Sequence, residues 1–535
     1  MMNTYDDKFD WKKRFEASTR SCGSSDSEEN PRNDYDDFRE LGTFDSQSFS
    51  PRRMVADIKS QIRLSNYTSW SPPAKYASIW HILSSTARSL LPSFIWSSQG
   101  YQSHRELHPS AWLDGLRGTA ALFVVFHHTS HAWFSDRAFA GWGSGGDNMN
   151  QYLIQLPIFR IVVSGYPQIA IFFVISGYAL SYKPMKLLHS GRSNEFLDSL
   201  AMSVFRRHTR LFLPAAGVML CAAFMTWMDW YGKGGGSREP PHLPTLSAQL
   251  WNWAGCVVEL AEPFSLRDTV SRYQPPYDTN LWTLPVEFRD SLIVFTTILA
   301  LARTRSTVRL CMSLGIIGYC LYSTYWDVFL FLSGMLLADL RFRRQAQSEN
   351  LQDPNQAGSR SRFSEWKAQN PTAVQRFWVV NFIIALWIVG MPEVGRGSGT
   401  SPGFVNLTNI IPHKYLAANK PDLFWVPIAA VYLVCCVDND TSLQAIFTNP
   451  FAQYIGKISF AMYMVHGPIL YSLGWHLQLK TVRWTGGQTD ASYGFAVFLA
   501  VLVVFPTIFW AADVVWRLID MKSVKFARWV SERVQ

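Results

Sequence analysis

One apolar stretch of the chain carries an unusual set of ionisable residues. Residues 113–133 read LDGLRGTAALFVVFHHTSHAW and place Asp114, Arg117 and His128 in or beside a lipid bilayer. Ionisable groups are costly there and mark function by default. Arg117 and His128 are eleven positions apart, close to three helical turns, so a helix sets them on one face about 16 Å apart. This arrangement suits a long substrate with an anionic end and a reacting end, and Asp114 can pair with Arg117.

The same residues have plainer interpretations, which stay open at this point. Arg117 lies near one end of the segment and can extend to the membrane surface simply to keep its charge in water. His127 suits a packing or interfacial position. His127 and His131 are four residues apart, a spacing that can bind a metal, but no carboxylate nearby completes a ligand set. We therefore expect no metal.

The segment FRRHTRLFLP is basic at its start and leads into a later apolar stretch. Its three arginines are expected to share a helical face at the cytosolic boundary, where guanidinium groups can grip phosphates. They would equally serve the topology of a membrane protein. These residues are Arg206, Arg207 and Arg210.

Three further residues are candidates for a site. Glu287 follows Pro285 at the start of an apolar segment, where it can act as an acid or base, or complement the helix dipole. Tyr178 follows a Ser-Gly pair that permits close helix packing. His466 lies midway along another apolar segment. It either has a functional role or only forms a hydrogen bond to a neighbouring helix.

Composition indicates what kind of chain positions these residues. Of 535 residues, 48% are hydrophobic and 15% aromatic, and 23 of the 89 charged residues lie in the first 60 positions. The remaining chain is about 14% charged, whereas soluble domains carry about 25%. The seven cysteines show no spacing typical of a disulfide framework or a zinc ribbon. This excludes a secreted disulfide scaffold, a nucleic-acid-binding module and a wholly soluble enzyme.

The apolar pattern predicts an all-α polytopic membrane bundle of about ten helices over residues 111–520. Residues 1–75 are expected to form a disordered cytosolic tail, 76–110 an interfacial amphipathic helix, and 521–535 a cytosolic C-terminal tail. The predicted spans are 112–134, 162–182, 211–231, 285–302, 310–325, 328–340, 378–394, 424–437, 455–475 and 494–516.

The basic loops predict the orientation of these spans. Segments 183–210 and 341–376 hold six and seven Lys or Arg residues, whereas 135–151 holds one. Because Lys and Arg accumulate on the cytosolic side, both termini are expected in the cytosol, with the body in the endoplasmic reticulum or another secretory membrane. Asn406, in Asn-Leu-Thr, then falls on the lumenal side as a glycosylation site.

Six segments together resemble the membrane acyltransferase family 3, the integral-membrane O-acyltransferases. They cover about residues 110 to 520 and include the family's Arg, ten residues, His spacing at Arg117 and His128. The segments are LDGLRGTAALFVVFHH, FFVISGYALS, RRHTRLFLP, LWTLPVEF, FLFLSGMLLADL and GKISFAMYMVH.

The resemblance implies an enzyme that moves an acyl group, often acetyl, from acyl-coenzyme A to a hydroxyl. It implies that His128, Arg117 and Glu287 act in catalysis. The arginines at 117, 206, 207 and 210 would hold coenzyme A, and Asp114, Tyr178 and His466 are candidates for contacts with the acceptor.

Fungal members with such polar N-termini resemble enzymes of specialised-metabolite pathways, so we expect a small lipophilic alcohol as acceptor. A cell-surface sugar or polysaccharide is the main alternative. Two hypotheses from other functional classes also remain. The chain could be a transporter, or a metal-dependent membrane hydrolase that uses the histidine cluster. A lipid bilayer is the expected surrounding, with no nucleic-acid partner.

Overall fold

The computed structural model of the chain describes residues 91–93, 107–134, 136–145, 150–232, 239–264, 272–350, 366, 367 and 369–534. The predicted tail, 1–75, lies outside the described residues, as does most of the predicted interfacial helix. The described residues from Pro109 onwards belong to one compact unit. Every helix or strand assigned in that part of the chain is a helix, which confirms the all-α prediction for those residues.

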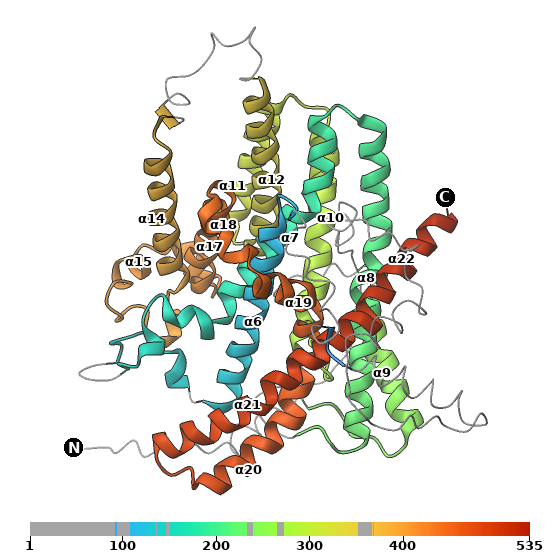
Figure 1. Cartoon of the computed structure of the whole chain (residues 1–535), viewed down its shortest axis with the longest axis vertical. Coiled ribbons are helices and arrows are strands. Elements are labelled where there is room, and N and C mark those ends of the chain that lie inside the picture. The colour runs from blue at the N-terminus through green and yellow to red at the C-terminus, as the bar shows by residue number, and fades with distance from the viewer. Residues whose placement is uncertain are drawn as a thin grey trace, which may run out of the picture. The chain divides into compact units, whose positions relative to one another are not determined.

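The α-helices are arranged as in Figure 1, where the labels follow the order below. They are α6 (Ala111–Trp133), α7 (Gly165–His189), α8 (Ser193–Trp227), α9 (Leu246–Leu260), α10 (Thr283–Leu301), α11 (Ser306–Tyr322), α12 (Trp326–Asn350), α14 (Pro371–Val389), α15 (Val405–Asn409), α16 (His413–Ala417), α17 (Trp425–Asn439), α18 (Thr441–Thr448), α19 (Pro450–Ile469), α20 (Trp475–Thr485), α21 (Asp490–Val515) and α22 (Met521–Val534).

Short 3-10 and π turns join some of these helices. They are η3 (Asp136–Phe139), η4 (Leu153–Gln155), η5 (Phe159–Val163), η6 (Thr279–Trp282), η8 (Val394–Arg396), η9 (Pro421–Leu423), η10 (Leu470–Gly474) and η11 (Trp516–Asp520).

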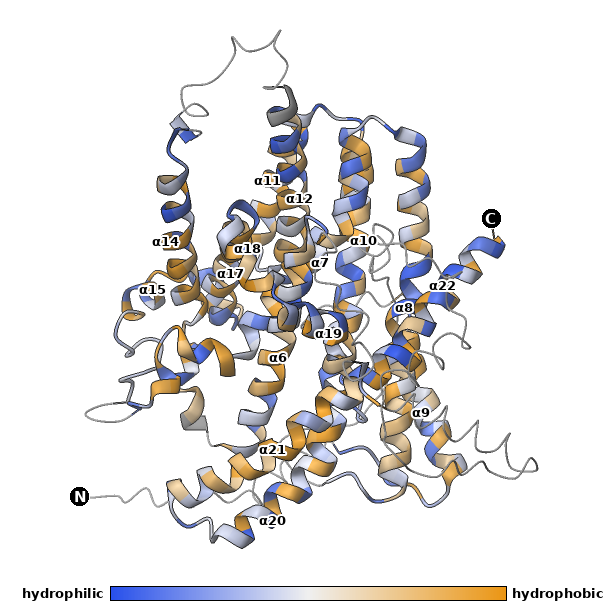
Figure 2. Ribbon diagram, viewed as in Figure 1, coloured by the Kyte–Doolittle hydropathy of each residue, from blue (hydrophilic) through white to orange (hydrophobic). Residues whose placement is uncertain are grey.

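Each of the ten predicted spans falls on a helix, but fewer helices are long and apolar enough to span a membrane. Four helical stretches in the described part of the chain are long and apolar enough to cross a bilayer: Ser193–Trp227, Pro371–Val389, Pro421–Asn439 and Asp490–Val534. Helix α6 lacks this character because its histidines, Arg117 and Asp114 lower its hydropathy, and α10 carries Glu287, Arg289 and Asp290. Figure 2 shows the apolar residues spread over most of α21, with hydrophilic residues at the C-terminal end of α22.

Helices α9 and α22 lie outside every predicted span, as do the shorter α15, α16 and α18 and all but the first residue of α20. Helix α9 occupies the segment 232–284 that reads as a loop; Thr245 caps its N-terminus, accepting a hydrogen bond from the Ala248 amide at 3.2 Å. The Trp253 indole of α9 donates to the Ala216 carbonyl oxygen of α8 at 3.1 Å. Helix α22 occupies the predicted C-terminal tail and packs against α8.

Glycines set two close helix crossings. Helices α6 and α19 meet at Gly118 and Gly456, where a Cβ on Gly456 would lie 2.6 Å from the Asp114 carbonyl oxygen. Helices α7 and α12 meet at Gly177 and Gly334, where a Cβ on either glycine would overlap backbone of the other helix. Small residues let helix backbones approach closely in this way, so α6 is held against α19 over the part that carries the candidate site.

The α7–α12 crossing gives a test of the packing. Replacing Gly334 by alanine puts a methyl group into the Val174 carbonyl oxygen, and overpacking of this kind costs typically about 1–3 kcal/mol. We expect a lower melting temperature in detergent and less folded protein. Gly315→Ala on α11 is the control, because no atom lies within 4 Å of its added Cβ; equal melting temperatures for both variants would contradict this packing.

The apolar core beside the site is built from four long helices. Buried side chains of α6, α8, α19 and α21 pack together, with contributions from α9 and from the segment before α10. Helices α20 and α21 form an antiparallel pair, visible side by side in Figure 1. This packing fixes α19 between α6 and α21, so the orientation of polar side chains on α6 and α19 is fixed by apolar contacts around them.

Candidate active site

One end of the candidate site is an ionic cluster at the first turns of α6. The Arg117 guanidinium pairs with the Asp114 carboxylate one turn away, and its Nε donates to the Ser459 hydroxyl of α19 at 3.1 Å. Both charged side chains are largely but not fully buried, at 14% and 28% exposed. Arg117 is therefore fixed toward α19 and remains partly accessible.

Glu287 of α10 belongs to the same cluster. Its carboxylate interacts electrostatically with Arg207 of α8 and with Arg117 of α6. Arg207 is buried, with its guanidinium 5.8 Å from the centre of the Phe295 ring, and Arg210 one turn further is equally buried, each 3% exposed. Helices α6, α8 and α10 thus bring Arg117, Arg207 and Glu287 into one region. The sequence alone presents these residues as separate candidates.

The other end of the site is a pair of histidines. The ring of His128 on α6 lies 5.1 Å, centre to centre, from the ring of His466 on α19. Because Arg117 contacts Ser459 and His128 contacts His466, the two helices run in the same direction and both α6 side chains face α19. The guanidinium and the imidazole therefore lie along one side of α6, as its helical spacing predicts.

His466 is embedded in a polar network that the sequence did not single out. It is fully buried; its Nε2 lies 3.2 Å from the amide nitrogen of Asn280, and its Nδ1 lies 3.2 Å from the Met462 carbonyl oxygen. The Tyr463 hydroxyl donates to the Asn280 carbonyl oxygen and lies 2.8 Å from the hydroxyl of Thr283. The available sequence signal was Gly467 directly after His466, which marks a close backbone approach.

Some candidate residues are not brought to this site. Tyr178 is fully buried and donates its hydroxyl to Asp438 at 2.8 Å, in a network with Arg341 and Arg344. The structure therefore places it with α12 and α17, and its role as an acceptor contact stays a prediction.

Arg289 and Asp290, next to Glu287, form a separate ionic group. The Arg289 guanidinium pairs with the Asp290 carboxylate at 2.7 Å and with the Asp327 carboxylate at 2.9 Å. This group joins α10 to α12, whereas Glu287 interacts electrostatically with the arginines of α6 and α8.

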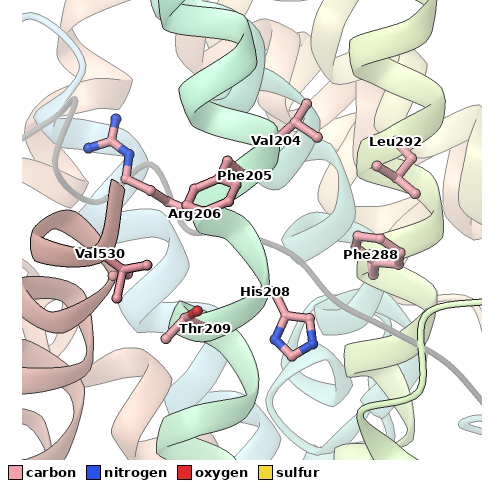
Figure 3. Close-up of a pocket in the computed structure, with 9 residues that line it drawn as sticks. Val204, Phe205, Arg206, His208, Thr209, Phe288, Leu292 and Val530 are labelled. Atoms are coloured by element: carbon pink, nitrogen blue, oxygen red, sulfur yellow. The ribbon is translucent and has the colours of Figure 1, made fainter. Parts of the chain in front are cut away.

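Arg206 lies in a different environment from Arg207 and Arg210, so the three do not form the single cluster that the sequence predicts. It lines a pocket of about 410 Å³ between α8, α10 and α22, drawn in Figure 3. Consecutive helix positions are rotated by about 100°, which turns Arg206 outward where Arg207 turns inward. Other lining residues are Phe205, His208, Thr209, Phe288 and Val530.

The remaining histidines of α6 have further partners, although the ring centre of His127 lies 5.0 Å from that of His128. The His127 Nδ1 lies 2.7 Å from the Val163 carbonyl oxygen of η5, and its ring centre lies 6.1 Å from that of His131. Among the described residues, no group of three or more His, Cys, Asp or Glu side chains is placed to hold a metal ion. The contact with the Val163 carbonyl oxygen therefore gives His127 a structural role that His128 does not share.

Chemically, this arrangement combines an anion-binding end with a basic end. Arg117 and Arg207 offer positive charge near Glu287, and His128 offers an imidazole about three turns further along the same helix as Arg117. The features define a helical protein with two polar groups, one at Arg117 and one at His128, separated by an apolar contact between α6 and α19.

The comparison with known families agrees with this description. The acyltransferase domain family (acyltransferase 3) matches residues 110–516, which include every helix of the site. The chain belongs to this family, and it is a membrane acyltransferase.

Fungal proteins are similar over most of their length. The O-acetyltransferase PaAT-1 of Phomopsis amygdali is 37% identical over 461 residues, 83% of this chain and 88% of that protein. Acyltransferase R4 of Phoma sp. (strain ATCC 20986 / MF5453) and acyltransferase clz18 of Cochliobolus lunatus are each 22% identical, over 78% and 74% of this chain and 94% and 92% of their own lengths. No solved structure matches the chain. These matches favour acyl transfer over the transporter and hydrolase readings.

Proposed function

We propose that the protein transfers an acetyl group from acetyl-coenzyme A to a hydroxyl of a small lipophilic acceptor in specialised-metabolite biosynthesis. The observation that carries the proposal is that Arg117 and His128 project from one helix onto the same neighbouring helix. An anionic donor anchored at Arg117 then directs its reacting end toward His128, about three turns further along α6. The O-acetyltransferase name of a 37% identical fungal relative supports acetyl as the group and oxygen as its acceptor.

In the proposed reaction His128 is the general base. Its imidazole accepts the proton of the acceptor hydroxyl while the hydroxyl oxygen attacks the thioester carbonyl. The carbon–sulfur bond breaks, the new ester forms, and the proton passes from His128 to the coenzyme A sulfur. We expect the His128 imidazole to be neutral at the start of the cycle, because its neighbour His466 is buried and apolar core residues surround this part of the structure.

The arginines are proposed to hold the donor's phosphates. Arg117 keeps an exposed fraction of 14%, enough to present part of its guanidinium to a ligand, and Arg207 and Arg210 add buried positive charge. Glu287 orients these guanidiniums, because it interacts with both Arg117 and Arg207. Arg206, at the pocket of Figure 3, offers a further cation to the nucleotide end of the donor.

The acceptor is proposed to enter from the histidine side. His466, in ring contact with His128, is the candidate acceptor contact on this side. Asp114 pairs with Arg117 at the other end, and its role as an acceptor contact stays a prediction. A cell-surface sugar or polysaccharide is the alternative acceptor.

We further propose that ten helices cross the membrane, with both termini cytosolic in a secretory membrane such as the endoplasmic reticulum. The ten are α6, α7, α8, α10, α11, α12, α14, α17, α19 and α21. Asn406 of α15 then lies in the lumen; its side chain is exposed, as a glycosylation site requires. Loss of a glycosidase-sensitive form in Asn406→Gln would support this orientation.

The test of the proposed function uses microsomes that contain the full chain and radiolabelled acetyl-coenzyme A, with metabolite extracts as acceptors. We expect label in a solvent-extractable ester that is absent from microsomes without the protein. Label confined to polysaccharide would support the alternative acceptor. Absence of label from every fraction, with folded protein present, would contradict the donor.

A further inference from the structure

The hydrogen bonds around His466 fix which of its nitrogens carries the proton. Nδ1 lies 3.2 Å from the Met462 carbonyl oxygen. A carbonyl oxygen only accepts hydrogen bonds, so Nδ1 must carry a proton to bond it. In a neutral imidazole Nε2 is then an acceptor, and the Asn280 side chain, 3.2 Å away, donates to it through its NH₂ group. Asn280 and Met462 together therefore define one neutral tautomer of His466.

Asn280 is itself held firmly. Its backbone NH donates to Asp278 Oδ1 at 3.1 Å, and its carbonyl oxygen accepts from the Tyr463 hydroxyl. Its side chain approaches α19 beside Gly467, where a Cβ would lie 2.8 Å from the Asn280 amide nitrogen and 2.6 Å from Asp278 Oδ1. Only a glycine at position 467 leaves room for this contact. The turn η6 is thus fitted against α19 at the residue that follows His466.

We propose that Asn280 is a positioning residue for the base: it holds His466 as the neutral Nδ1–H tautomer, and His466 in turn supports the ring of His128. The two rings are 5.1 Å apart with an interplanar angle of 36°, so a change in the orientation or charge of one acts directly on the other. The inference rests on the proposed function, in which His128 accepts a proton.

The chemical reason for a neutral His466 follows from the proposed step. His128 becomes a cation as it takes the proton of the acceptor hydroxyl. A second cation about 5 Å away in a poorly solvated site would oppose that transfer. An amide donor on Nε2 stabilises the neutral ring, whereas a carboxylate there would stabilise the doubly protonated ring.

Kinetics provide the first test. For Asn280→Ala we expect kcat to fall about 100-fold, the effect of a misplaced catalytic group, with an unchanged KM for acetyl-coenzyme A because the Arg117 end is untouched. Asn381→Ala is the control: its amide donates to the Phe377 carbonyl oxygen within α14, away from the site, and we expect wild-type kinetics. Wild-type kcat in Asn280→Ala would overturn the proposal, as would a change in KM alone.

Nitrogen NMR of histidine-labelled full-length protein in lipid nanodiscs provides a test independent of turnover. The His466 signals are assigned by their loss in His466→Gln. We expect the neutral Nδ1–H pattern in the wild type and a doubly protonated ring in Asn280→Asp, which keeps the side-chain shape. An Nε2–H tautomer in the wild type, or no change in Asn280→Asp, would overturn the inference. If the wild type folds but transfers no acetyl group, the proposed function fails, while the NMR pattern still decides the state of His466.

Discussion

His128→Ala lowers acyl transfer by about 100- to 10,000-fold, the range typical for loss of a positioned base, while the protein still inserts and folds. The imidazole of His128 is the group on α6 that faces His466 and lies on the same side as Arg117. Removing it leaves the donor-binding end intact. The measurement is label transfer from acetyl-coenzyme A in microsomes with equal amounts of folded protein, and KM for the donor is expected to stay near its wild-type value.

The neighbouring histidine supplies the control for this experiment. His127 bonds the Val163 carbonyl oxygen of η5 through Nδ1, and its ring centre lies 5.0 Å from that of His128. His127→Gln is expected to retain turnover and to change mainly thermal stability. Full activity of His128→Ala, or an equal loss in both variants, would show that the base lies elsewhere.

Arg117→Ala raises KM for acetyl-coenzyme A by about 10- to 100-fold, because a hydrogen bond to a charged group contributes about 1.5–3 kcal/mol. The variant also leaves the Asp114 carboxylate without its cation, so a lower melting temperature is expected as well. Arg117→Lys keeps the charge but loses the planar fork, and an intermediate KM is expected. Titration of the donor in microsomes separates KM from kcat.

Ser459→Ala is the matched control for Arg117. It removes the hydrogen bond to Nε, 3.1 Å in the structure, and the bond from the same hydroxyl to the Gly456 carbonyl oxygen, and it leaves the pair with Asp114 in place. A small increase in KM is expected. If Arg117→Ala lowers the melting temperature but changes neither KM nor kcat, then Arg117 is structural and the phosphates are held by other cations.

The helices that carry the site could be predicted because the pattern of apolar residues that indicates each helix lies within a short stretch of sequence. The apolar run at 112–134 predicts a helix, and the structure has one at Ala111–Trp133. The one-sided placement of Arg117 and His128 follows from helical periodicity alone. Helix α9 was missed because 232–284 falls between two predicted spans and is interpreted as a loop, although a loop of that length in a compact unit is itself evidence against the assignment.

The partners of the site residues could not be predicted, because they come from distant segments. Asn280 precedes a helix in a stretch of Asp, Thr and Asn that is typical of a turn, and only the packing of η6 on α19 brings it to His466. The electrostatic interaction of Glu287 with Arg207 likewise depends on how α8 and α10 pack. Arg206 was grouped with Arg207 by sequence adjacency, although a single step along a helix changes the direction of a side chain.

Because Arg117 and His128 belong to one uninterrupted helix clamped at Gly118 against Gly456, no hinge lies between them. The helix itself therefore sets their separation, and we expect selection among thioester donors to depend on the length of the donor. Truncated thioesters that lack the nucleotide portion would engage the imidazole without the guanidinium, and they should saturate poorly even at high concentration.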